Sequence, residues 1–70
     1  MSNNIRIERA RLKMSQSELA EALNVATGTV CSWEKDIGSC STLKLLEMSN
    51  IFGTSTDYII GVTDRRERVL

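Results

Sequence analysis

The segment from residue 15 to residue 35 constrains the fold more than any other part of this chain. Ser15 precedes Glu18 by three residues, which is the pattern of a capping box at the start of a helix. The apolar stripe that follows has helical spacing, and Asn24 ends it where a left-handed backbone is expected. The stripe consists of Leu19, Ala20 and Leu23. The pattern therefore predicts a short capped helix that ends in a tight turn.

A second short helix is predicted directly after the turn, from about Thr27 to Lys35. Val30 and Trp33 share one of its faces, so we expect both in the core. Its start is weakly marked, because a cap at position 26 would be an alanine without a side-chain oxygen, and Thr27 is the alternative cap. Two helices joined in this way form a helix-turn-helix, whose second helix can lie in the major groove of DNA.

The rest of the chain predicts three further helices and no strands. A first helix is expected over residues 3–13, where Ile5, Arg9 and Leu12 recur at helical spacing. A loop over residues 36–40 precedes a fourth helix, and a short fifth helix follows it. The residues that mark their ends are Ser41 or Thr42, Gly53 and Gly61. We therefore expect one all-α, five-helix domain over residues 1–63, followed by a charged C-terminal tail over residues 64–70. The arginines of this tail are expected in solvent, and the alternatives are that they contact a phosphate or continue into a further segment.

Composition narrows the possible functions. Apolar residues make up 41% of the 70 residues, which is enough for one small core, and nine basic residues balance nine acidic ones. No apolar run approaches the roughly 20 residues that a membrane span needs. The N-terminus, which is rich in charge, does not resemble a signal peptide. We expect a cytoplasmic protein that does not bind membranes.

Catalytic and metal chemistry find no support in the sequence. Histidine is absent, and no nucleophile has a neighbouring base. Cys31 and Cys40 are too few for a structural zinc site, which takes four ligands, and we expect both to be reduced, inert thiols. We therefore expect a protein that is not an enzyme and that binds no cofactor or metal.

Taken in order along residues 5–62, these features resemble the phage Cro and repressor type of helix-turn-helix family. The resemblance implies a compact, lambda-repressor-like DNA-binding domain. It is carried by several segments together: Ile5 and Arg9, Ser15–Ala20, Val25, Thr29–Val30, Trp33–Glu34, Leu45–Leu46, Phe52–Gly53 and Ser55–Gly61.

The resemblance also implies a role for individual residues. Arg9 and Glu34 match a pair that forms a structural ion pair between the first helix and the recognition helix. The positions that reach base edges are Thr27, Gly28 and Ser32. Contacts to the DNA backbone are implied for Ser15, Gln16, Thr29 and Lys35, and the N-terminus of the second helix suits a phosphate because its backbone N–H groups are free.

This chain departs from the family at several of these positions. A threonine, a glycine and a serine cannot make the bidentate base contacts that discriminate most strongly, so DNA shape is expected to contribute to specificity. Asp36 and Cys40 stand where glycine and proline are usual in the loop after the recognition helix.

Two functions remain open at this point. The first is a transcriptional regulator, a repressor of phage or mobile-element type, which binds a palindromic double-stranded DNA operator as a homodimer. Apolar residues over 58–62 are a candidate dimer surface. The alternative is an antitoxin-like or regulatory module that binds a protein partner and binds DNA weakly, which the zero net charge favours.

Overall fold

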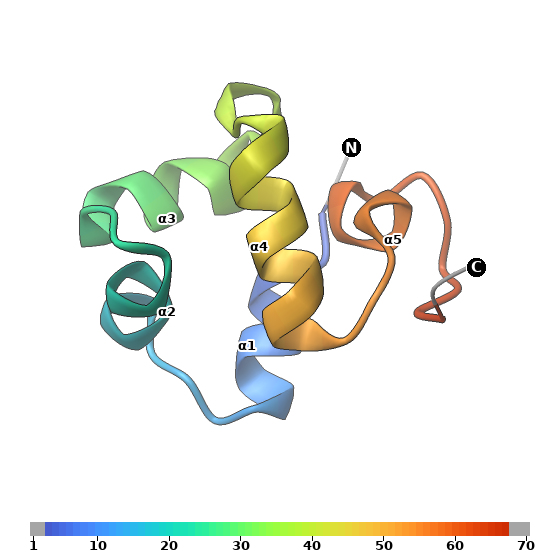
Figure 1. Ribbon diagram of the computed structural model, residues 1–70, viewed down its shortest axis with the longest axis horizontal. Coiled ribbons are helices and arrows are strands. Elements are labelled where there is room, and N and C mark those ends of the chain that lie inside the picture. The colour runs from blue at the N-terminus through green and yellow to red at the C-terminus, as the bar shows by residue number, and fades with distance from the viewer. Residues whose placement is uncertain (1–2, 68–70) are drawn as a thin grey trace.

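The computed structural model describes residues 3–67 and contains only helices in that range (Figure 1). Helices α2 and α3 lie together on one side of the molecule, α4 runs through its middle, and α5 lies on the other side. The elements are α1 (Ile5–Arg11), α2 (Gln16–Leu23), α3 (Thr27–Lys35), a 3-10 turn η1 (Ile37–Ser39), α4 (Thr42–Phe52) and α5 (Thr56–Ile60). The expected all-α, five-helix fold is confirmed. None of the helices over residues 3–67 is long and apolar enough to cross a membrane.

Local capping rules account for most helix ends. Ser15 and Glu18 form both hydrogen bonds of the capping box at the start of α2. Asn24 ends that helix with a left-handed backbone, with a φ of 58°. Ser41, not Thr42, caps α4 by accepting a hydrogen bond from the backbone of Lys44.

Helix α3 lacks a side-chain cap. Ala26 occupies the cap position, and the Thr27 hydroxyl donates to Oγ of Ser17 at 3.4 Å instead of capping the helix. The first backbone N–H groups of α3 therefore have no side-chain acceptor at the cap.

Helix α1 is shorter than the sequence pattern predicts. It ends at Arg11, and Lys13 takes a left-handed backbone with a φ of 56°. The backbone N–H of Met14 then donates to the carbonyl of Arg9, which turns the chain toward α2. Leu12 falls in this turn, beyond the end of α1, and is 44% exposed.

One core joins all five helices. Trp33 lies in it, as its spacing predicts, and Ala20 is almost fully buried in α2, which together with α3 forms the motif. The other buried apolar side chains of this cluster are Ile5, Leu19, Leu23, Val30, Met48, Phe52 and Ile59. The core thus fixes α3 against α2 and leaves the opposite side of α3 in solvent.

A buried carboxylate lies between α1 and the C-terminal segment. Glu8 is fully buried and accepts hydrogen bonds from the Arg66 guanidinium at 2.8 and 3.0 Å and from the Tyr58 hydroxyl at 3.0 Å. The bonds from Arg66 lower the pKa of Glu8, whereas burial raises the pKa of Tyr58 and keeps its hydroxyl protonated. Arg66 therefore binds the domain through Glu8, whereas the arginines of the tail were expected in solvent. Residues 68–70 of that tail lie outside the described residues.

Candidate nucleic-acid interface

The exposed side of α3 carries the three residues that were expected to reach base edges. Thr27, Gly28 and Ser32 are all exposed. Ser32 follows Gly28 by four residues, so both positions lie on the same face of the helix. A Cβ atom added at Gly28 would meet nothing within 4 Å, which shows that packing within the chain does not require glycine there. This face is open to a large partner.

An ion pair ties α3 to α1. Nε of Arg9 lies 2.7 Å from Oε2 of Glu34, and the two side chains are only 15% and 11% exposed. The Arg9 guanidinium also donates to the carbonyl of Met14 at 2.8 Å, just before α2. One arginine therefore holds α3 and the entry to α2 in a fixed relation.

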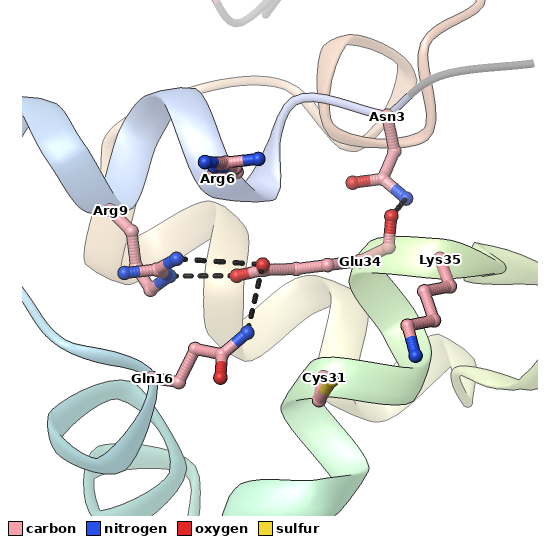
Figure 2. Close-up of a pocket in the computed structure, with 7 residues that line it drawn as sticks. All are labelled: Asn3, Arg6, Arg9, Gln16, Cys31, Glu34 and Lys35. Atoms are coloured by element: carbon pink, nitrogen blue, oxygen red, sulfur yellow. Dashed lines mark hydrogen bonds and ion pairs between the residues drawn. The ribbon is translucent and has the colours of Figure 1, made fainter.

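Gln16 extends this network to α2. Its amide nitrogen donates to Oε1 of Glu34 at 3.1 Å, as the dashed line in Figure 2 shows. The bond fixes the side chain beside the N-terminus of α2, where the first backbone N–H groups have no partner within the helix. The Ser15 hydroxyl accepts from the backbone of Glu18, so its own hydrogen remains for an external acceptor.

A hollow of about 800 Å³ opens beside this network, between α1 and α3. We call it the α1–α3 hollow. Arg6 of α1 and Lys35 of α3 both line it (Figure 2). Within residues 3–67, neither side chain has a hydrogen-bond or ion-pair partner. The remaining lining residues are Asn3, Arg9, Gln16, Cys31 and Glu34. Because Arg9 and Glu34 neutralise each other, the hollow carries an excess of positive charge.

The residues expected to contact a DNA backbone differ in exposure. Ser15 and Lys35 are exposed, whereas Gln16 and Thr29 are half-buried. Gln16 and Lys35 line the α1–α3 hollow, and Ser15 directly precedes Gln16. The structure thus brings two of the four, Gln16 and Lys35, to the same hollow.

The loop after α3 accommodates the two residues that depart from the family pattern. Asp36 has an extended backbone, with a φ of −150°, so glycine is not needed, and its carboxylate accepts from the backbone of Gly38 at 3.0 Å. The backbone of Cys40 donates to the carbonyl of Ile37 at 2.9 Å, a bond that proline could not make. Burial raises the pKa of the Cys40 thiol to about 11, which disfavours the reactive thiolate.

Sequence reasoning missed two features of this region. Arg6 and Asn3 are not among the residues expected above to contact DNA or to join the helices. The Asn3 amide donates to the carbonyl of Trp33 at 2.8 Å and so satisfies a carbonyl in the last turn of α3. The sequence signal for Arg6 was its position three residues before Arg9, which places both on neighbouring parts of α1.

Comparison with known proteins places these features in a family. Residues 5–59 match the family described as Helix-turn-helix. The HTH-type transcriptional regulator ImmR of Bacillus subtilis (strain 168) is 38% identical over 63 residues, which cover 87% of this chain and 50% of that protein. The chain thus spans about half the length of this curated relative. No solved structure gives a significant match. Since the matched residues include both helices of the motif and the network that joins them, the chain belongs to the phage Cro and repressor type of helix-turn-helix family.

Proposed function

We propose that this chain is a sequence-specific transcriptional regulator, a repressor of phage or mobile-element type, which binds double-stranded DNA through α3. The observation that carries the proposal is the open face formed by Thr27, Gly28 and Ser32 on a helix held rigidly from behind. A helix of this size enters the major groove of B-DNA. The family membership and the regulator named among its relatives support the same function.

Three small residues determine how α3 would contact the DNA bases. The methyl group of Thr27 suits an apolar contact with a thymine methyl, and its hydroxyl and that of Ser32 can donate to or accept from base edges. Gly28 lets the helix backbone approach the bases closely. Since none of these contacts is bidentate, DNA shape supplies part of the specificity.

Contacts to the DNA backbone would position α3 in the major groove. Ser15 and Gln16 offer hydroxyl, amide and backbone N–H donors to one phosphate, and Lys35 offers a charge nearby. Thr29 is the fourth proposed contact and uses its hydroxyl. Such contacts act on all DNA sequences alike and make binding sensitive to salt.

A homodimer on a palindromic operator completes the proposal. Two copies related by a two-fold axis would place their recognition helices about one turn of DNA apart. Of the candidate dimer residues over 58–62, Tyr58 and Ile59 are buried in the domain, and Val62 is 58% exposed. The proposed contact therefore involves Val62 and leaves out the first two.

The test is selection of binding sites from random duplex DNA at near-physiological salt. We expect the retained DNA to share a two-fold symmetric site. Gln16→Ala should weaken binding to every sequence, whereas Thr27→Ala should change the preference at one base position. If both variants merely shift the affinity uniformly, base readout by Thr27 is contradicted.

The second candidate is an antitoxin-like or regulatory module that binds a protein partner. Two exposed leucines one turn apart on α4 favour it, because Leu43 is 65% and Leu46 52% exposed. Retention of no consensus site, with binding that vanishes as salt rises, would support this candidate over the first.

A further inference from the structure

Asn3, which lies just before α1, binds the C-terminal end of α3. Its amide nitrogen donates to the carbonyl of Trp33 at 2.8 Å and to that of Glu34 at 3.3 Å, and Figure 2 draws the second of these bonds. Its amide oxygen accepts from the backbone N–H of Ile5 at 3.2 Å, in the first turn of α1. Carbonyls of a last turn and N–H groups of a first turn have no partner within their own helix. One side chain therefore satisfies both the end of α3 and the start of α1.

Asn4 makes the same kind of contact with the C-terminal end of α5. Its amide nitrogen donates to the carbonyl of Tyr58 at 2.7 Å, and its backbone N–H donates to the carbonyl of Ile59 at 3.0 Å. Both carbonyls belong to the last turn of α5. Two adjacent residues of the chain thus hold the ends of α3 and α5, and we call Asn3 and Asn4 the asparagine clamp.

The asparagine clamp connects the two surfaces on which the proposed function depends. Helix α3 carries the face proposed to read bases, and α5 leads through Gly61 to Val62, the exposed residue of the proposed dimer contact. The Cα atoms of adjacent residues are about 3.8 Å apart and are joined by a planar peptide bond, so Asn3 and Asn4 cannot move independently. The clamp therefore restricts how far α3 can shift relative to α5.

From this arrangement we propose that Asn3 and Asn4 are positioning residues, which set α3 relative to α5 and thereby fix the separation of the two recognition helices in the DNA-bound dimer. The inference rests on the proposed function, including the homodimer. Two half-sites lie about 34 Å apart, so a small tilt of α3 against the dimer contact displaces the second recognition helix from its groove. Both asparagines act through the helices that they bind and not through a contact with DNA.

The experiment compares Asn3→Ala and Asn4→Ala with the unaltered chain, by selection of sites from random duplex DNA and by affinity for the selected site and for a random duplex. Asn3→Ala should lower the ratio of these two affinities about tenfold, a loss similar to one mismatched base pair, because α3 is held less firmly against the bases. Asn4→Ala should select the same half-site sequence with a variable spacing between half-sites, because α5 is released. Neither variant should change the slope of log K against log salt, since no phosphate contact is lost.

Ser55→Ala is the matched control. The Ser55 hydroxyl accepts from the backbone of Tyr58 at 3.1 Å and caps the other end of α5, so this variant loses a helix cap and keeps the asparagine clamp. It should lower the melting temperature and leave the affinity ratio and the half-site spacing unchanged.

The same result for Asn3→Ala and Asn4→Ala would overturn the inference while leaving DNA binding by α3 intact. A reduced salt slope in Asn3→Ala would also overturn it, because Asn3 would then contact a phosphate directly. Absence of DNA binding by the unaltered protein would overturn both this inference and the proposed function.

Discussion

The two oxygens of Glu34 connect three helices at the scale of single atoms. They accept hydrogen bonds from Arg9 of α1 and Gln16 of α2, while the Glu34 backbone belongs to α3. Because the side chains of this ion pair are largely buried, water cannot fully replace a partner that is removed. The proposed DNA-binding face therefore depends on a small polar network behind it.

Arg9→Met should reduce the free energy of unfolding by about 2–3 kcal/mol, because Glu34 would keep its charge in a largely buried place without its cation. Urea denaturation measures the loss. Glu47→Gln is the control, since the Lys44–Glu47 pair is more exposed and should contribute less than about 1 kcal/mol. Equal losses in the two variants would show that burial of the Arg9–Glu34 pair does not determine its contribution.

The pKa of Glu8 predicts how stability changes in acid. Hydrogen bonds from Arg66 lower this pKa, against the opposing effect of burial, with Tyr58 and Arg11 as further neighbours. The stabilisation is therefore present above the unfolded-state pKa of roughly 4.3 and is lost as the pH falls through the lower folded-state pKa. Melting temperatures measured from pH 6 downward should fall more steeply for the unaltered protein than for Glu8→Gln. Parallel curves would contradict this account.

At the scale of elements, the ends of the helices could be predicted from the local sequence. The burial of Glu8 in α1 could not. Capping by Ser15, the left-handed Asn24 and the stop at Gly53 were predictable, because each depends on neighbours a few residues away. The burial of Glu8 was not predictable, because its partner Arg66 lies 58 positions along the chain. In the candidate site, the family resemblance led to Arg9 and Glu34, whereas nothing in the local sequence showed that Arg6 lacks an acidic partner.

Two glycines should respond oppositely to alanine. Gly28→Ala should stabilise the domain by about 0.5 kcal/mol, because α3 gains helix propensity and the added Cβ meets nothing. Gly53→Ala should destabilise it by about 1 kcal/mol, because its φ of +68° is left-handed. Urea denaturation of both variants checks the signs. A destabilised Gly28→Ala variant would show that the N-terminus of α3 does not tolerate a side chain.

At the scale of the whole molecule, contacts join α1 to the last segment that the structure describes. Arg66 bonds to Glu8 through its side chain and accepts a hydrogen bond from the backbone of Ser55 at 3.1 Å. The C-terminal segment therefore supplies the closer of two cations that face the buried carboxylate of Glu8, while Nε of Arg11 lies 3.5 Å from that carboxylate. Stability should depend on residues beyond the last helix.

Arg66→Met should lower the free energy of unfolding by roughly 2 kcal/mol, since it leaves Glu8 buried with a weaker set of partners. Thermal denaturation at neutral pH measures the change. Arg65→Met, one residue away and exposed, should change stability by less than about 0.5 kcal/mol. Similar melting temperatures for the two variants would mean that Arg11 and Tyr58 suffice to stabilise the buried Glu8 without Arg66.

Glu8 and Arg9 are consecutive residues, and this sets the rotation of α1 about its own axis. Successive side chains of a helix point about 100° apart, so the two residues face different neighbours: Glu8 the C-terminal segment and Arg9 the recognition helix. A rotation of α1 about its axis moves both residues together and so changes both ion pairs at once. The position of α3 against α1 is therefore coupled to the contact between α1 and Arg66.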